Sequence, residues 1–131
     1  MYKIGLAWIC LASLSSVVAW EAANATGENA AASAQQGERI FAGRCAMCHG
    51  QAGQGTSMAP TLKNISGRKA GSTAFAGYSS SLRQSNLVWT DAEIAAFLEN
   101  PSKKVPGTRM FIKVPDAASR QQLVAYLKTL R

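Results

Sequence analysis

The sequence predicts a small all-α domain, and three observations lead to that prediction. The chain has 131 residues, of which 47% are hydrophobic and 16% charged, which suits one globular domain with a core. Helix start signals precede three segments with apolar residues at helical spacing, and no segment reads as a convincing strand. Long Gly- and Ser-rich stretches separate these segments. We therefore expect three main helices, short helices and long loops, in a chain too small for a Rossmann enzyme or an α/β barrel.

Residues 1–25 have the layout of a secretory signal peptide. A basic start is followed by an apolar run, and Ala23 and Ala25 form a small-x-small cleavage site. We expect cleavage after Ala25, loss of Cys10 with the signal, and a periplasmic protein. The alternative is an uncleaved membrane anchor, because the apolar run is just long enough to span a bilayer.

Residues 26–36 are rich in Ala, Asn, Ser and Gln without hydrophobic periodicity, which is typical of a flexible extension. The globular domain then covers residues 37–131. Its first helix is expected over residues 37–46, after a capping box formed by Ser33 and Gln36.

Two more helices follow in the second half of the domain. Thr90 and Glu93 form a capping box for a helix that stops at Asn100, before Pro101. Asp116 can cap a final helix with an apolar face. The residues of that face, which we expect in the core, are Leu123, Tyr126, Leu127 and Leu130.

The chemistry is concentrated in the pentapeptide Cys45-Ala46-Met47-Cys48-His49, and His49 is the single histidine of the chain. Cys-x-x-Cys-His is the attachment signature of a c-type haem. On one helical turn the two thiols can reach two vinyl groups of the same porphyrin edge, and the imidazole comes up beneath the iron. We therefore predict one haem c, bound covalently through Cys45 and Cys48, with His49 as the proximal ligand.

Three other interpretations of the pentapeptide are weaker. A disulfide between Cys45 and Cys48 would close only a tiny loop. A thioredoxin-like redox pair needs a βαβ unit, which the sequence does not indicate. A structural zinc site needs four ligands, and the chain offers three once the signal is removed.

The iron also needs a second axial ligand or an open position for a substrate. Met47 lies in the attachment turn and cannot reach the opposite face of the haem. Met58 follows His49 so closely that it would have to wrap tightly around the haem edge, whereas Met110 is far enough along the chain to cross to the far face. A lone Met is more often core filler than a ligand, so this choice stays open on the residues alone.

At this point the chain resembles a known family, class I cytochrome c of the mitochondrial and bacterial cytochrome c2 type. The likeness runs from about Gly37 to Arg131, with its motifs in the family's order and close to its spacing. Those motifs are the attachment pentapeptide, Pro60, Trp89, Phe97-Leu98-Glu99-Asn100-Pro101 and Pro106-Gly107-Thr108-Arg109-Met110.

The resemblance implies a small cytochrome c fold whose helices and loops wrap one covalent haem, with the first and last helices crossing. It implies that His49 and Met110 are the axial ligands and that the Pro60 carbonyl accepts the His49 Nδ1 hydrogen, which would raise the donor strength of the imidazole. It also assigns Tyr78, Trp89 and Arg68 to the buried haem propionates. The plainer interpretation of these last three is two core aromatics and one solvated arginine.

Two residues depart from the family pattern. Phe97 stands where the family often carries a Tyr near the Met sulfur, so we expect Met110 ligation to be retained with an altered midpoint potential. The family aromatic that follows the axial Met corresponds either to Phe111 or to Ile112, and the sequence does not decide which one covers the haem face.

A His/Met pair leaves no coordination position for a substrate, so we expect an electron carrier and no enzyme. The resemblance implies transfer from a bc1-type donor to a terminal oxidase or a photosynthetic reaction centre. The alternatives are a haem enzyme or gas sensor with an open or labile sixth iron position, and the same carrier anchored by an uncleaved signal.

The formal net charge of +7 suggests docking on acidic surfaces of membrane redox complexes. Basic residues near the attachment turn and Met110 are expected to ring the haem edge: Arg44, Lys63, Lys103, Lys104, Arg109 and Lys113. No motif supports nucleic-acid binding or a small-molecule substrate. We expect a monomer, because the partners need the haem edge.

Overall fold

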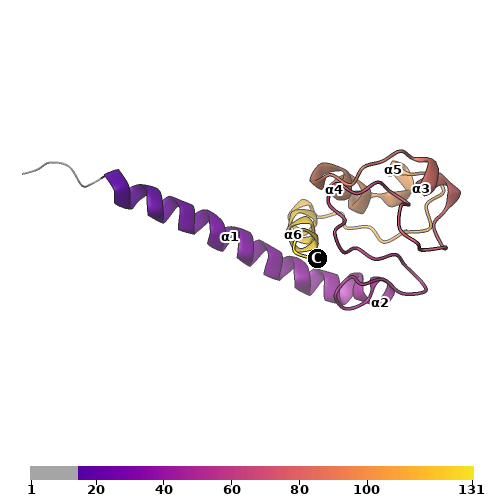
Figure 1. The fold of residues 1–131 in the computed structure, drawn as a ribbon, viewed down its shortest axis with the longest axis horizontal. Helices are drawn as coiled ribbons and strands as arrows, with labels where there is room; N and C mark the ends of the chain where they lie inside the picture. Colours follow the sequence, from indigo (N-terminus) through magenta and orange to yellow (C-terminus); the bar gives the residue numbers. More distant parts are fainter. Residues whose placement is uncertain (1–14) are drawn as a thin grey trace, which may run out of the picture.

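The computed structural model describes the chain from residue 15 to residue 131, with side chains from residue 27 onward (Figure 1). Residues 1–14 of the expected signal peptide (1–25), which include Cys10, lie outside the described residues. The helices, in chain order, are α1 (Ser15–Arg44), α2 (Ala46–His49), α3 (Ser80–Gln84), α4 (Asp91–Glu99), α5 (Pro101–Lys104) and α6 (Ala117–Leu127).

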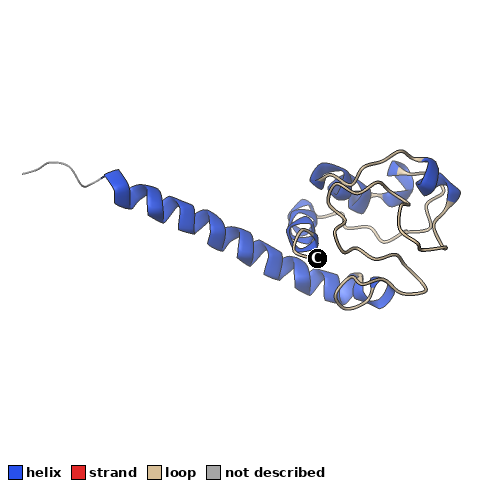
Figure 2. Cartoon of the chain, viewed as in Figure 1, coloured by secondary structure: helices blue, strands red, loops and turns tan. Residues whose placement is uncertain are grey.

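Figure 2 shows helices joined by long loops, and residues 15–131 contain no strand. An isolated antiparallel bridge pairs Lys69 with Val88. The prediction of an all-α fold with three main helices, α1, α4 and α6, is confirmed. Over the same residues, no helix combines the length and the apolar character that a membrane span requires.

The start of α1 differs from the expectation. The backbone is helical throughout 26–36, the segment predicted to be a flexible extension, and Ser33 lies inside the helix instead of capping it. The physical reason is composition: Ala, Glu and Gln have high helix propensity, so the helix extends back from its packed end without an apolar face. Side chains 27–32 are exposed, and the N-terminal part of α1 projects away from the rest of the chain (Figure 1).

The C-terminal part of α1 crosses α6, and Gly37 allows the close approach. A Cβ atom at Gly37 would collide with the backbone carbonyl of Gln122, whereas Gly43 on the same helix has open space around it. One turn after Gly37, the ring of Phe41 packs on that of Tyr126 with centroids 5.2 Å apart. The predicted contact between the first and last helices is therefore confirmed.

Both later helices begin at the predicted caps. Thr90 Oγ1 accepts the Glu93 amide hydrogen at 3.2 Å, and Asp116 Oδ2 accepts the Ser119 amide hydrogen at 2.7 Å. The helix that starts at Asp91 ends at Glu99, with Asn100 as its C-cap, as predicted.

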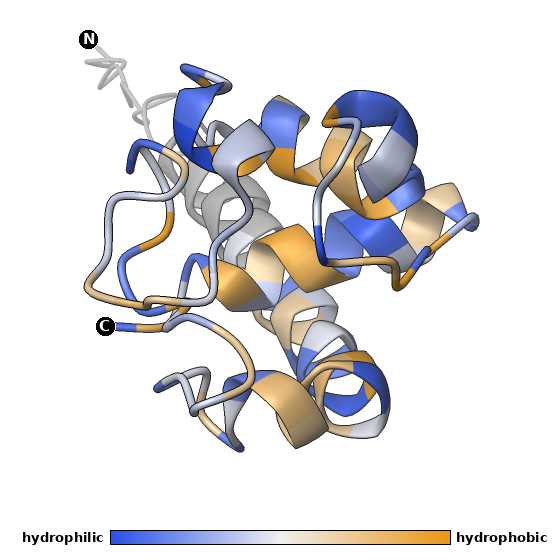
Figure 3. Cartoon of the chain, turned by 90° about the vertical axis from the view of Figure 1, so that its right-hand side faces the viewer, coloured by the Kyte–Doolittle hydropathy of each residue, from blue (hydrophilic) through white to orange (hydrophobic). Residues whose placement is uncertain are grey.

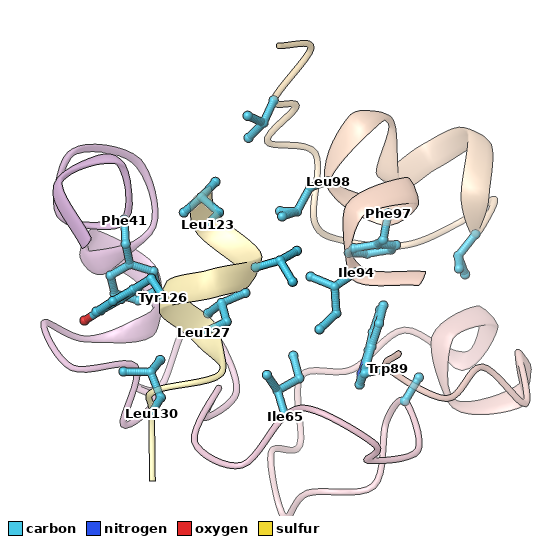
Figure 4. Packing of buried hydrophobic residues seen from close by; sticks show 14 of the residues in the cluster. Phe41, Ile65, Trp89, Ile94, Phe97, Leu98, Leu123, Tyr126, Leu127 and Leu130 are labelled. Atoms are coloured by element: carbon cyan, nitrogen blue, oxygen red, sulfur yellow. The ribbon is translucent and has the colours of Figure 1, made fainter. Parts of the chain in front are cut away.

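The helices and the loops between them bury one apolar cluster. Figure 4 shows that Phe41 and Leu123 belong to the α1 and α6 side of this cluster, and Trp89 and Phe97 to the other side. The predicted core residues of α6 and Leu130 just beyond it are all buried. In Figure 3 the helices carry both hydrophobic and hydrophilic positions, as expected when one side of each helix faces this core.

Candidate haem site

The attachment turn continues α1 through a change of direction at Cys45. The Cys45 amide still donates to the Phe41 carbonyl at 2.8 Å, and the His49 amide donates to the Cys45 carbonyl at 2.9 Å. Cys45, Cys48 and His49 therefore lie on consecutive helical backbone, anchored through Phe41 in the core. Cys45 is half-buried, and this burial raises the pKa of its thiol to about 11.

The loop after His49 folds back and brings Pro60 beside the imidazole. The Gly55 amide donates to the His49 carbonyl at 2.8 Å, and the Thr56 amide donates to the Ala59 carbonyl at 2.9 Å. These bonds place the Pro60 carbonyl oxygen 2.8 Å from His49 Nδ1, the arrangement that the resemblance implied. Burial lowers the pKa of His49, which favours the neutral imidazole needed to bind a metal through Nε2.

A cavity of about 490 Å³ opens beside this turn. All eight residues singled out from the sequence line it, although they come from segments far apart in the chain. They are Cys45, Cys48, His49, Pro60, Arg68, Tyr78, Trp89 and Met110. The rest of the wall is mainly apolar and includes Ile65, Leu82 and Phe97, so the cavity has the size and character of a prosthetic-group site.

Of the three methionines considered as axial ligands, the structure favours Met110 as a residue of the cavity interior. Met110 is half-buried, lines the cavity and packs against the apolar cluster. Met58 also lines the cavity but is 62% exposed, and Met47 is 81% exposed and lies outside the lining.

Met110 follows a turn in which the Thr108 amide donates to the Val105 carbonyl at 3.0 Å and Gly107 has φ 85°. The positive φ explains the glycine at this turn. Val114 closes the segment by donating its amide to the Leu98 carbonyl of α4 at 2.8 Å.

Arg68 is held inside the wall and is not a solvated loop charge. Its guanidinium donates from Nη1 to the Lys63 carbonyl at 2.6 Å and from Nη2 to the Thr61 carbonyl at 2.7 Å. Its Nε atom is buried and has no hydrogen-bond partner, and burial lowers the pKa of the guanidinium. A buried donor without a partner fits a cavity that receives an anionic group such as a haem propionate.

The other two predicted propionate partners also line the cavity. The Tyr78 hydroxyl lies 2.8 Å from Thr73 Oγ1, and Arg83 stacks over the Tyr78 ring at 5.3 Å. Trp89 is buried, and its ring packs edge-on against that of Phe97 at 5.0 Å. Trp89 is thus a core residue and a cavity residue at the same time.

Sequence reasoning missed helix α3 and the wall residues that it carries. Ser79 caps this helix by accepting the Leu82 amide hydrogen at 3.2 Å, and the buried side chain of Leu82 lines the cavity. Phe75, which packs edge-on against Tyr78, was missed as well. The signal was a run of serines before one apolar residue, which we interpreted as loop.

Both Phe111 and Ile112 line the cavity, with Phe111 the more exposed at 75% against 40%.

Comparisons with known proteins point to a single family. The family model described as Cytochrome c matches residues 34–131. Cytochrome c of Tetrahymena pyriformis is 43% identical over 74% of this chain and 88% of its own, and cytochrome c of Euglena viridis is 35% identical over 75% and 97%. Among solved structures, cytochrome cH from Methylobacterium extorquens is similar with a TM-score of 0.67 and 40% identity, covering 73% of this chain and 97% of its own.

Proposed function

The chain belongs to the cytochrome c family and carries one haem c through Cys45 and Cys48, and from this we propose that it is a one-electron carrier with His49 and Met110 as axial ligands. The observation that carries the proposal is that His49, Met110, Cys45 and Cys48 line the same, mainly apolar cavity. The haem supplies an iron that alternates between Fe(III) and Fe(II).

Each residue of the site has a separate task in this proposal. Cys45 and Cys48 hold the cofactor through thioether bonds, so it stays bound in both oxidation states. The Pro60 carbonyl orients the His49 imidazole through Nδ1 and leaves Nε2 for the iron. Met110 would supply the second protein ligand of the iron and would thereby exclude a substrate from it.

The apolar wall and Arg68 support electron transfer without binding the iron themselves. Buried Leu82, Phe97 and Trp89 keep water away from the cofactor, which reduces the rearrangement that accompanies a change of charge. Arg68 would hold a propionate through its buried Nε hydrogen, and Tyr78 and Trp89 line the same cavity. The burial of a carboxylate is then offset by a charge-assisted hydrogen bond.

The charge distribution supports docking on an acidic partner. Arg44 and Arg109 line the cavity, and no Asp or Glu of the described residues does so. Lys63, Lys103 and Lys113 are exposed, whereas Lys104 forms an ion pair with Glu93. We propose that these cations steer the protein, as a monomer, to a bc1-type donor and to a terminal oxidase or reaction centre, with rates that fall as salt rises.

We further propose that residues 1–25 export the chain to the periplasm, with a tethered carrier as the alternative. N-terminal sequencing of the mature protein separates the two, because a start near Thr26 indicates cleavage and a retained Met1 indicates an anchor.

Electron transfer itself is tested with the haem-loaded protein and membranes that contain a quinol-oxidising complex and an oxidase. We expect reduction of the protein by the first complex, oxidation by the second, and slower rates in 200 mM than in 20 mM salt, since those concentrations lie on either side of strong charge screening. Rapid carbon monoxide binding with no electron transfer would instead favour the enzyme or gas-sensor alternative.

A further inference from the structure

We propose that the ion pair between Glu93 and Lys104 is a latch that keeps the Met110 loop, residues 105–113, closed over the iron. Lys104 Nζ lies 2.6 Å from Glu93 Oε2, and both side chains are about one-third exposed, at 31% and 33%. The proposal rests on the proposed function, because it assigns a positioning role toward the axial ligand Met110.

The ion pair joins α4 to α5, and the short helix α5 needs contacts with other elements to keep its position. Lys104 is the last residue of α5, a single helical turn that directly precedes the Met110 loop. One isolated turn is not stable by itself, so the position of α5 depends on what it packs against. Pro101 and Val105 supply buried apolar contacts, and Lys104 supplies a charged contact to α4.

Glu93 is well placed to hold that contact. It lies in the first turn of α4, where a negative charge is favoured by the helix dipole, and its amide is fixed by the Thr90 cap. Its Oε2 atom is buried, and the charge beside it is that of Lys104 Nζ. Oε2 therefore depends on the Lys104 charge, and removing the lysine leaves a buried carboxylate oxygen uncompensated.

The rest of the loop is held by a few contacts at its two ends. At its start the Val105 amide donates to the Pro101 carbonyl at 2.8 Å, and just beyond its end the Val114 amide donates to Leu98 at 2.8 Å. Between them, Arg109 Nη1 donates to the Gly77 carbonyl at 3.3 Å, and the Lys113 carbonyl accepts from Arg44 Nη1 at 3.4 Å. A loop with so few anchors opens locally at a lower free energy than the whole protein unfolds, so one ion pair at its start can change that opening.

The chain offers a matched control on the same helix. Asp91 also lies in the first turn of α4, and its Oδ2 pairs with Lys128 Nζ of α6 at 2.8 Å, away from α5. Glu93→Gln and Asp91→Asn therefore remove the same charge from the same helical turn, and each breaks one ion pair. Only the first breaks the contact with α5.

The test titrates the haem-loaded protein with imidazole, which competes with Met110 for the iron. Binding is measured through the loss of the weak far-red absorption band that Met-sulfur ligation produces. We expect Glu93→Gln to bind imidazole about two- to fivefold more tightly than the parent, the range of a partly exposed ion pair. Lys104→Gln should exceed this effect, the double variant should fall short of the summed single effects, and Asp91→Asn should stay within about 1.5-fold of the parent.

Denaturant unfolding of the same variants separates a latch from general stability. Equal shifts in imidazole affinity for Glu93→Gln and Asp91→Asn would overturn the latch, as would a lower unfolding midpoint with unchanged imidazole affinity. In both cases a far-red band in the parent leaves the proposed function standing. A parent that has no such band, and binds imidazole without competition, would overturn the axial role of Met110 and the latch together.

Discussion

The His49 Nδ1 atom and the Pro60 carbonyl oxygen lie 2.8 Å apart, although the two residues belong to different sides of a loop that must fold back to join them. The bond ties the His49 imidazole to the backbone through Nδ1 and leaves Nε2 available to a metal. An imidazole that donates from Nδ1 is a stronger electron donor at Nε2, which favours Fe(III).

Pro60→Gly is expected to weaken this bond, because the carbonyl loses the fixed φ of proline. We expect the midpoint potential to rise by about 10 to 30 mV, roughly a 1.5- to 3-fold change in the one-electron equilibrium at 59 mV per decade. The measurement is a potentiometric titration of Pro60→Gly and the parent. The control variant is Pro115→Gly, which removes a proline outside the cavity. A potential that is unchanged or lower in Pro60→Gly would contradict this role.

Phe97→Tyr tests the departure from the family at the Met110 side of the cavity. Phe97 is buried, lines the cavity and packs on Trp89, so a tyrosine at this position would bring its hydroxyl into the wall of the cavity that Met110 also lines. A hydrogen bond to the Met sulfur withdraws electron density from the iron, and we expect a higher potential with Met ligation retained. Phe97→Leu controls for altered packing without a hydroxyl, and equal potentials for Phe97→Tyr and the parent would refute the expectation.

Gly37→Ala should destabilise the crossing of α1 and α6. The new methyl group would meet the Gln122 carbonyl, and overpacking of this kind costs about 1 to 3 kcal/mol. Gly43→Ala lies on the same helix in open space and should stabilise it by about 0.5 to 1 kcal/mol. Urea unfolding of the haem-loaded variants measures both, and a shift in the same direction for the two would argue against the close contact.

Asp116→Asn should change the acid sensitivity of the fold. The hydrogen bonds from the Ser119 side chain and amide hold the pKa of Asp116 below its ordinary value. A lowered carboxyl pKa stabilises the folded state above about pH 4, and that stabilisation is lost as pH falls through the folded pKa. Thermal unfolding should therefore show a higher unfolding temperature for the parent than for Asp116→Asn at pH 7, and the difference should shrink as the pH falls below about 4. A difference that does not depend on pH would contradict the assignment.

The features that sequence reasoning predicted well depend on short-range signals. The attachment pentapeptide and the caps at Thr90 and Asp116 are each contained within a few residues, so their chemistry can be recognised locally. The start of α1 was predicted wrongly because the helix propensity of alanine outweighs a missing apolar face.

Other features needed the folded chain. The ion pair between Glu93 and Lys104 forms only because the helix is interrupted at Asn100, and its two members are too far apart in sequence for an i, i+3 or i, i+4 pair. The same holds for the Arg68 guanidinium, whose partners are backbone carbonyls of a loop that no sequence pattern places.

The optical spectrum of the haem-loaded protein, oxidised and reduced and then exposed to carbon monoxide, tests the central claim most directly. The account predicts a low-spin spectrum with the weak far-red band of Met-sulfur ligation and no change on addition of carbon monoxide, because His49 and Met110 fill both axial positions. A high-spin spectrum that changes at once with carbon monoxide would mean an open sixth position and would contradict a role restricted to electron transfer.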